Sequence, residues 1–436
     1  MCALRITHYS FKEMNAQIKE LTLTAFTYGG DALGRLEDGR AVFVPFGLPG
    51  ERVRIRITEE RRGYARGELV EILQAAPERI EPRCKHFGTC GGCHYQHLPY
   101  EAQLRVKTEI LRDQLQRIGG IEDPPVGPMA ACPSQWNYRN QVQFHLTREG
   151  KIGYVRVGLP PPLRSSGASR RPAPTVIPIS ECHLPDAAIN GLWPQLDFEP
   201  GMNIERVSIR AGMEDELMLV LEADTPEAPE LEIEAGISVA HVFGEQSIII
   251  AGEDHIYLRV LDRDFYVSAP SFFQVNTAMA AKMVQHILTN LPISQSTLLL
   301  DVYCGAGLFS AFLASKCRRL IGIESSSSAC EDFAINLDEF ENVELYEDSA
   351  EHALPSLDVQ PDIVLVDPPR AGLERAALDA IVQMNPATIV YVSCDPSTLA
   401  RDAARFIKGG YRLRDVTPFD LFPQTYHIES ISLFER

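Results

Sequence analysis

No part of the 436-residue sequence is apolar for long enough to cross a bilayer, which takes about 18 or more consecutive apolar residues in a helix. The first residues, Met1–Gln17, also lack the apolar core of a secretory signal. No internal repeat is visible. We therefore expect a cytoplasmic, monomeric protein without a membrane partner.

Positive charge is scarce, with 41 Lys and Arg against 59 Asp and Glu and a formal net charge of -18. This balance argues against binding nucleic acid through bulk electrostatics, although a local basic surface would still be compatible with it. The stretch 151–171 has no acidic residue, and a solvated loop explains it as well as a binding surface does; we expect 159–174 to be a mobile loop. Its five basic residues are Lys151, Arg156, Arg164, Arg170 and Arg171.

The N-terminal part, 14–75, is predicted to be a five-stranded barrel of the OB type, because short Val-, Ile- and Leu-rich runs alternate there with turn signals. Arg52, Arg54 and Arg56 alternate along one of these runs. They either contact phosphates or keep the barrel soluble. The predicted strands are Ile18–Ala25, Ala41–Pro45, Glu51–Ile57 and Gly67–Ile72.

A linker at Ala76–Pro82 should lead into a β-rich central domain, 76–260, that contains one amphipathic helix at Tyr100–Ile118. This helix could instead pack on the next domain. From 261 to 436, apolar strands alternate with helices, which indicates an α/β, Rossmann-like domain with a parallel sheet covered on both faces. The apolar side of the helix consists of Leu104, Ile110, Leu111, Leu115 and Ile118. The predicted α/β elements are strands at Leu298–Val302, Arg319–Glu324, Asp362–Asp367 and Ala387–Ser393 and a helix at Leu308–Ala314.

A glycine-containing turn, Asp301–Gly307, follows the first of these strands. Glycines let a ligand approach the backbone, and doubly wound sheets bind ligands beyond the carboxyl ends of their strands. Glu324 ends the next strand, where a carboxylate can accept hydrogen bonds from ribose hydroxyls. The spacing is not the G-x-G-x-x-G of dinucleotide enzymes, which favours S-adenosylmethionine over NAD.

Two further strands end in residues suited to catalysis. Asp367-Pro-Pro-Arg370 fixes a carboxylate at a strand tip, and methylases of exocyclic amines usually carry an aromatic residue where Arg370 stands. Cys394 follows another strand, as a candidate nucleophile, and Glu429 could serve as a base. This pair suits C5 of uracil, because thiolate addition at C6 activates C5 and a base must then remove the C5 proton. Such a site should stabilise the thiolate.

The chain resembles the RNA 5-methyluridine (uracil-C5) methyltransferases. The motifs Ser271–Asn276, Asp301–Gly307, Asp367–Arg370, Ser393–Pro396 and His427–Glu429 stand in the family's order. The resemblance implies that Cys394 is the nucleophile, that Glu429 is the base and that the N-terminal barrel is an RNA-binding TRAM domain. It also implies S-adenosylmethionine contacts at Gln274, Tyr303, Gly305, Glu324, Asp348 and Asp367.

Three cysteines cluster at Cys84, Cys90 and Cys93, and Cys182 is a more distant candidate. Four thiolates suit either zinc or an iron–sulfur cluster, and the single C-x2-C pair does not decide between them. Members of the family with this pattern carry a [4Fe–4S] cluster, so the resemblance implies one here with these four ligands.

The substrate implied by the resemblance is RNA. Members with both barrel and cluster resemble the 23S rRNA enzymes, which predicts a loop or flipped uridine of 23S rRNA. The alternative is the T-loop uridine of tRNA. A small-molecule methyltransferase would need neither barrel nor cluster, a non-catalytic RNA-binding protein would not need Cys394 and Glu429, and methylation of another base is a third alternative.

Overall fold

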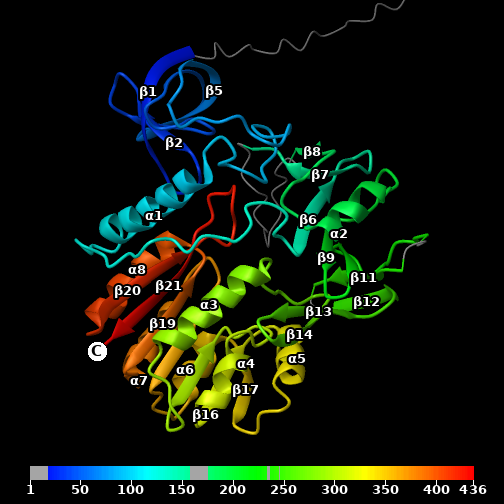
Figure 1. The fold of residues 1–436 in the computed structure, drawn as a ribbon, viewed down its shortest axis with the longest axis vertical. Helices are drawn as coiled ribbons and strands as arrows, with labels where there is room; N and C mark the ends of the chain where they lie inside the picture. Colours follow the sequence, from blue (N-terminus) through cyan, green and yellow to red (C-terminus); the bar gives the residue numbers. More distant parts are fainter. Residues whose placement is uncertain (1–17, 158–174, 233–235, 245) are drawn as a thin grey trace, which may run out of the picture. The chain divides into compact units, whose positions relative to one another are not determined.

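The computed structural model describes residues 18–157, 175–232, 236–244 and 246–436 (Figure 1). Arg164, Arg170, Arg171 and the predicted loop 159–174 lie outside the described residues. The chain forms two compact units, Met1–Glu81 and Pro82–Arg436. The predicted boundary near residue 260, between the central and catalytic domains, stays a proposal.

The first unit holds a closed barrel with the strand order β1-β2-β3-β5-β4. Apolar residues alternate along its strands and meet inside, for example Leu23, Val42 and Ile55. The four-residue β2 was not among the predicted runs, because Gly34 interrupts its apolar pattern. A Cβ at Gly34 would lie 2.4 Å from a methyl group of Leu21, so the close strand pairing explains the glycine. The strands are β1 Ile18–Phe26, β2 Ala32–Arg35, β3 Ala41–Val44, β4 Arg52–Glu60 and β5 Tyr64–Gln74.

The three barrel arginines do not present free charge. Arg52 and Arg54 both pair with Glu20, at 3.0 and 2.8 Å, and Arg56 pairs with Glu68 at 3.2 Å. Carboxylates of neighbouring strands therefore neutralise this face, which favours the solubility interpretation over phosphate contact.

The predicted linker begins as part of the barrel unit. The fully buried carboxylate of Glu51 accepts hydrogen bonds from Arg79 Nε at 2.6 Å and from the backbone N–H groups of Leu48 and Ala76. Ala76–Arg79 is thus fastened to the barrel, and the division between the units falls after Glu81.

The second unit contains a seven-stranded sheet of order β12-β11-β10-β9-β6-β7-β8 and a separate hairpin, β13-β14. Phe144 and Trp193 pack in the core beneath this sheet. The predicted β character of the central region is therefore confirmed. Its elements are β6 Gln141–Leu146, β7 Ile152–Val155, β8 Val176–Pro178, α2 Ala187–Leu192, η1 Trp193–Gln195, β9 Arg206–Ala211, β10 Leu217–Glu222, β11 Ser238–Phe243, β12 Gln246–Ala251, β13 His255–Val260 and β14 Arg263–Ser268.

The other large sheet has the order β17-β16-β15-β18-β19-β21-β20. Its first five strands are parallel, and β21 runs antiparallel to both β19 and β20. Every residue of β15, β18 and β19 is buried, so both faces of the sheet centre are covered, as predicted for a Rossmann-like domain. The strands are β15 Leu298–Val302, β16 Arg319–Glu324, β17 Val343–Glu347, β18 Ile363–Val366, β19 Thr388–Ser393, β20 Arg412–Phe419 and β21 Glu429–Glu435.

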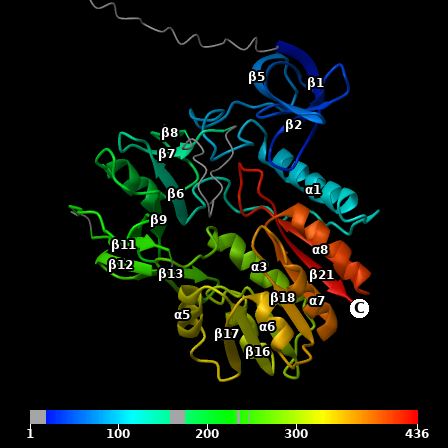
Figure 2. The same ribbon diagram turned by 180° about the vertical axis from the view of Figure 1, so that it is seen from behind.

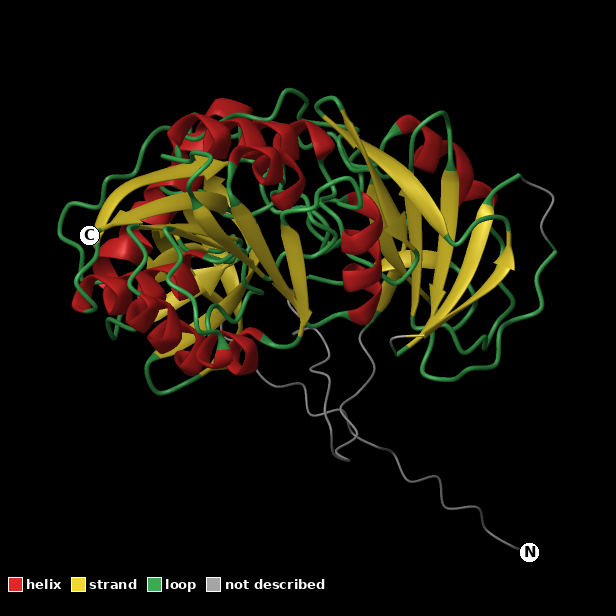
Figure 3. Cartoon of the chain, turned by 90° about the horizontal axis from the view of Figure 1, so that it is seen from below, coloured by secondary structure: helices red, strands yellow, loops and turns green. Residues whose placement is uncertain are grey.

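Helices surround these strands (Figure 3). The helix predicted at Leu308–Ala314 is shorter, with α4 at Ser310–Leu313 followed by a 3-10 turn, η2 at Ala314–Lys316, because the glycine turn continues through Phe309. No helix of the described residues is long and apolar enough to span a membrane. The remaining helices are α3 Thr277–Asn290, α5 Ser327–Asn336, α6 Ala350–Ser356, α7 Arg375–Met384 and α8 Pro396–Lys408.

The predicted amphipathic helix is α1, Tyr100–Arg117, which packs alongside α8 (Figures 1 and 2). Ile110, Leu111 and Leu115 are buried on its apolar side, as expected. Ile118 was wrongly placed on that side: it follows the helix as its C-cap and is 46% exposed. The helix therefore packs on a helix of the α/β sheet, although it lies in sequence within the predicted central domain, 76–260.

Candidate functional site

The carboxyl ends of three adjacent strands carry the predicted catalytic residues. Val366 of β18 pairs with Tyr391 of β19, and Ser393 of β19 pairs with Ser430 of β21. Asp367 follows β18 directly, Cys394 follows β19, and Glu429 is the first residue of the antiparallel β21. Because Cys394 follows Ser393 and Glu429 precedes Ser430, the next position of this antiparallel ladder brings the thiol and the carboxylate together.

The glycine turn after β15 has the backbone form that its sequence predicts. Tyr303, Gly305 and Gly307 have φ angles of 64, 54 and 88°. A Cβ on Gly305 would meet nothing within 4 Å, so its backbone faces open space, whereas a Cβ on Gly307 would lie 2.4 Å from Leu337. Gly305 can thus be approached by a ligand, and Gly307 permits tight internal packing.

Glu324 is the polar centre beside this turn. Its carboxylate accepts hydrogen bonds from the N–H groups of Gly305 at 3.0 Å, Ser325 at 2.8 Å and Ser326 at 2.9 Å. The backbone N–H of Asp348 donates to the carbonyl of Glu324 at 2.9 Å, which brings the exposed Asp348 to the same sheet edge.

Gln274 lies on a separate segment before α3. Its backbone carbonyl accepts a hydrogen bond from Asn140 Nδ2 at 3.0 Å, and its side chain is half-buried. The neighbouring Asn276 caps α3 by accepting from Met279 N. The segment is therefore anchored at Gln274 and at Asn276.

Two carboxyl groups near the turn are costly to ionise. Burial, followed by repulsion from Glu324, raises the pKa of Asp301 to about 7, although Ser310 Oγ donates to this carboxyl at 2.6 Å. Burial, with repulsion from Asp301 and Glu324, raises the pKa of Asp367 to about 7 as well. Asp301 Oδ1 is buried without a hydrogen-bond partner. Such a cluster of perturbed carboxyl groups is typical of a site that binds a cation or hydrogen-bond donors.

The predicted base acts electrostatically on the predicted nucleophile. The expectation that the site stabilises the thiolate is wrong for this structure: burial, then repulsion from Glu429 and Asp367, raises the pKa of Cys394 to about 12. Only the guanidinium of Arg370 among the main causes opposes this rise. Burial and repulsion from Asp367 also raise the pKa of Glu429 well above its ordinary value, again against Arg370. Arg370 is thus the cation shared by the thiol and the carboxyl group.

Arg370 is in turn held by His427. Arg370 Nη2 lies 3.2 Å from His427 Nδ1, and burial together with Arg370 lowers the pKa of His427 well below its ordinary value. The neutral imidazole therefore accepts this hydrogen bond at Nδ1. From the sequence, Arg370 indicates only that N-methylation is disfavoured. Its position directly after Asp-Pro-Pro, at the same strand tip, is the signal for its electrostatic role.

The four predicted metal-binding cysteines line one small pocket of the second unit, together with Arg139. Cys182 interacts electrostatically with Cys84, Cys90 and Cys93, and burial raises the pKa of Cys90 and Cys93 to about 12. The fold thus gathers four cysteines from segments some 90 residues apart. Within the described residues, no three His, Cys, Asp or Glu side chains are placed to hold a single metal ion.

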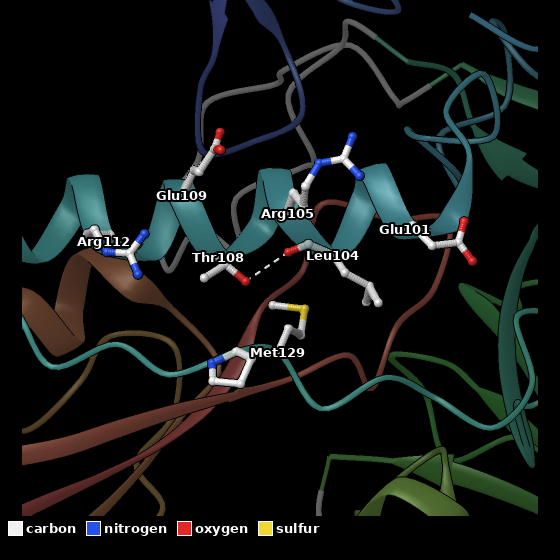
Figure 4. Close-up of a pocket in the computed structure, with 8 residues that line it drawn as sticks. Glu101, Leu104, Arg105, Thr108, Glu109, Arg112 and Met129 are labelled. Carbon is white, nitrogen blue, oxygen red and sulfur yellow. Dashed lines mark hydrogen bonds between the residues drawn. The ribbon is translucent and has the colours of Figure 1, made fainter. Parts of the chain in front are cut away.

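A separate open groove of about 440 Å³ lies along α1 (Figure 4). Leu104, Pro128 and Met129 form its apolar part, and Thr108 Oγ1 donates to the Leu104 carbonyl at 2.8 Å. None of the predicted catalytic, cofactor or cysteine residues lines it. The groove is therefore no part of the strand-end site.

The sheet has a glycine turn after β15, an acidic residue at the end of β16, and a thiol and a carboxyl group at the same edge. These features are those of an S-adenosylmethionine-dependent methyltransferase. The family model described as tRNA (Uracil-5-)-methyltransferase matches residues 244–436, and the TRAM domain model matches residues 9–70. The chain belongs to the RNA uracil-C5 methyltransferase family with a TRAM domain, and is an S-adenosylmethionine-dependent RNA methyltransferase.

Similar proteins support this assignment along the whole chain. An uncharacterised RNA methyltransferase of Chlorobaculum tepidum is 33% identical over 96% of this chain and 96% of its own length, and one of Halalkalibacterium halodurans is 32% identical over 96% and 97%. The crystal structure of the Pyrococcus abyssi tRNA (uracil-54, C5)-methyltransferase superposes with a TM-score of 0.68, at 24% identity, over 95% of this chain and 99% of that one. The predicted fold class is thereby confirmed.

Proposed function

We propose that the enzyme methylates C5 of a uridine in 23S rRNA through a covalent adduct between Cys394 Sγ and C6, and that Glu429 removes the C5 proton. The observation that carries this proposal is the pairing of Ser393 with Ser430, which brings Cys394 and Glu429 to adjacent positions at the ligand-binding edge of the sheet.

The residues around the glycine turn fit S-adenosylmethionine. Gly305 leaves open space beside its backbone, and the Glu324 carboxylate is already oriented by three N–H groups. When bound, the cofactor supplies an electrophilic methyl group carried on a sulfonium cation. The residues that would hold it are Gln274, Tyr303, Gly305, Glu324, Asp348 and Asp367.

The first chemical step belongs to Cys394. Its thiol releases a proton to solvent water. The thiolate then forms a bond to C6 of uracil while the C5=C6 electrons move toward C5 and the O4 enolate. A thiol with a pKa of about 12 is a poor source of thiolate at neutral pH. The guanidinium of Arg370 favours the anion, so Arg370 assists formation of the nucleophile.

Glu429 acts after C5 has gained its methyl group. The carboxylate takes the proton from C5, the electron pair of that bond re-forms the C5=C6 double bond, and Cys394 leaves C6 as thiolate. Because burial and Asp367 raise the pKa of Glu429, its carboxylate holds the abstracted proton well, while Arg370 favours the ionised form needed beforehand.

The choice of RNA rests on architecture. A TRAM barrel together with a four-cysteine pocket fits a large folded RNA, where contacts far from the target base add affinity. The second candidate is a tRNA uridine. It is favoured by the Pyrococcus abyssi tRNA (uracil-54, C5)-methyltransferase, whose structure matches 95% of this chain although its substrate is tRNA. Label transferred from S-adenosylmethionine to 23S rRNA fragments or to unmodified tRNA, mapped by mass spectrometry, distinguishes the two.

The cysteine pocket also fits a [4Fe–4S] cluster with Cys84, Cys90, Cys93 and Cys182 as ligands. Four thiolates suit the group chemically, and an iron–sulfur cluster separates its thiolates more widely than a zinc ion, which needs each sulfur within about 2.3 Å. The cysteines lie outside the strand-end site, so the group would be structural. Iron and sulfide analysis of anaerobically purified protein tests this proposal: about four irons per chain support it, and stoichiometric zinc without iron refutes it.

A further inference from the structure

The loop between β20 and β21, Asp420–Ile428, carries His427 and leads directly into Glu429, the first residue of β21. Other elements hold its first half residue by residue. Lys107 Nζ pairs with Asp420 at 2.6 Å and donates to the Phe422 carbonyl at 3.0 Å. Asn276 Nδ2 donates to the Leu421 carbonyl at 3.0 Å, and Tyr138 Oη donates to the Pro423 carbonyl at 3.0 Å.

Gln424 is the most firmly held residue of this loop. It is 2% exposed, and its φ of 70° is a left-handed conformation that few non-glycine residues adopt. Its carbonyl accepts hydrogen bonds from the N–H groups of His94 at 2.8 Å and Tyr95 at 3.0 Å. These two residues directly follow Cys93 of the cysteine pocket.

Gln103 of α1 completes the attachment. Its Oε1 accepts from Gln424 N at 3.0 Å, and its Nε2 lies 3.0 Å from Gln424 Oε1 and 3.1 Å from the Tyr95 carbonyl. The backbone N–H of Gln424 can only donate, which fixes the orientation of the Gln103 amide. One buried side chain, 1% exposed, thus joins the loop that precedes Glu429 to the segment that follows Cys93.

We propose that Gln103 is a positioning residue for the base, acting through Gln424 to set where Glu429 enters the site. This inference rests on the proposed function, because it requires Glu429 to remove the C5 proton. Gln103 and Lys107 lie one turn apart on α1 and hold the same loop, so α1 serves as the rigid support of the base. A misplaced base should impair proton removal more than the earlier formation of the Cys394 adduct.

The test compares Gln103→Met with Gln114→Met in the full-length enzyme. Gln114 is a buried glutamine of the same helix whose side chain accepts from Ser397 Oγ on α8 instead. We expect Gln103→Met to slow turnover about 10- to 100-fold and to raise the fraction of covalent protein–RNA adduct on denaturing gels, as Glu429→Gln should. Gln114→Met should lower the unfolding temperature comparably without accumulating adduct.

A second variant covers the case in which Gln103→Met does not fold. Gln424→Gly suits the left-handed backbone and removes only the side-chain half of the attachment, so a smaller rise in adduct is expected. If Glu429→Gln accumulates adduct but neither Gln103→Met nor Gln424→Gly does, the inference is wrong and the proposed function stands. If Glu429→Gln itself accumulates none, the proposed role of Glu429 fails, and the inference fails with it.

Discussion

Glu429 raises the cost of ionising Cys394 across two antiparallel strands whose last pair is Ser393 and Ser430. The thiol and the carboxylate are 35 positions apart in the sequence, and the antiparallel insertion of β21 beside β19 brings them together. Arg370, from the neighbouring strand end, is the cation that favours the ionised form of both. This relationship leads to predictions about reactivity, stability and RNA binding.

Arg370→Met should make Cys394 less reactive. Because the guanidinium lowers the pKa of this thiol, its loss should reduce the rate of alkylation by iodoacetamide at a fixed pH by roughly two- to tenfold. In the parent enzyme the rate should still be rising at pH 10, since the pKa of Cys394 is about 12. Peptide mass spectrometry reports the site, and the surface variant Arg375→Met is the control. Equal rates in parent and Arg370→Met would contradict the electrostatic role.

Asp301→Asn should increase the stability of the enzyme relative to the parent, and this increase should grow as the pH rises. The pKa of Asp301 is raised from 3.8 to about 7 on folding, so the folded chain binds the extra proton between these values. The parent therefore loses stability as the pH rises through this range, and the Asn variant does not. Between pH 5 and 8, urea unfolding should show a relative gain of about 1–3 kcal/mol. Asp338→Asn, on the surface, is the control, and a pH-independent difference would contradict the prediction.

Lys107→Met should destabilise the second unit strongly. Lys107 and Asp420 are both fully buried, and removal of the cation leaves a buried carboxylate with no opposing charge. The expected loss is about 3–5 kcal/mol. Lys107→Met/Asp420→Asn should recover much of it, because the double variant buries no unpaired charge. Arg117→Met breaks an exposed pair on the same helix and should cost less than about 1 kcal/mol. A small effect of Lys107→Met would show that the pair is dispensable.

Removal of residues 1–81 should weaken RNA binding while S-adenosylmethionine binding is nearly retained. These residues form a separate compact unit with the TRAM match, and all predicted cofactor residues lie in the other unit. Calorimetry with the cofactor and filter binding with RNA measure the two affinities. The opposite outcome, with cofactor affinity lost and RNA affinity kept, would overturn the assignment of the barrel.

Local patterns were sufficient to predict four of the five parallel strands, the glycine turn and α1, but not β17, Val343–Glu347. Apolar runs such as Leu298–Val302 and Arg319–Glu324 are strands with the predicted bounds, because each is a buried strand closed by a polar or glycine turn. Cys394 could be found as a candidate for the same reason, since it follows a buried strand directly.

Long-range pairings could not be read from local patterns. Tertiary packing determines the register of β21 and the pairing of Arg54 with Glu20. It also determines the attachment of Gln103 to Gln424, which lies more than 300 positions away in the sequence. Alternating arginines on a strand look the same in sequence whether they face phosphates or carboxylates. The existence of the short strand β2 and the exposure of Ile118 also depend on the neighbouring elements of the fold, which the local sequence does not determine.

The central claim is that Cys394 forms the covalent bond and Glu429 resolves it. The most direct measurement is the amount of denaturation-resistant protein–RNA adduct formed by the parent, Cys394→Ala and Glu429→Gln with S-adenosylmethionine and an RNA that the parent methylates. The account predicts no adduct and no product with Cys394→Ala. It predicts that Glu429→Gln accumulates adduct carrying the transferred methyl group and releases little product. Full turnover by Cys394→Ala, or normal release by Glu429→Gln, would contradict it.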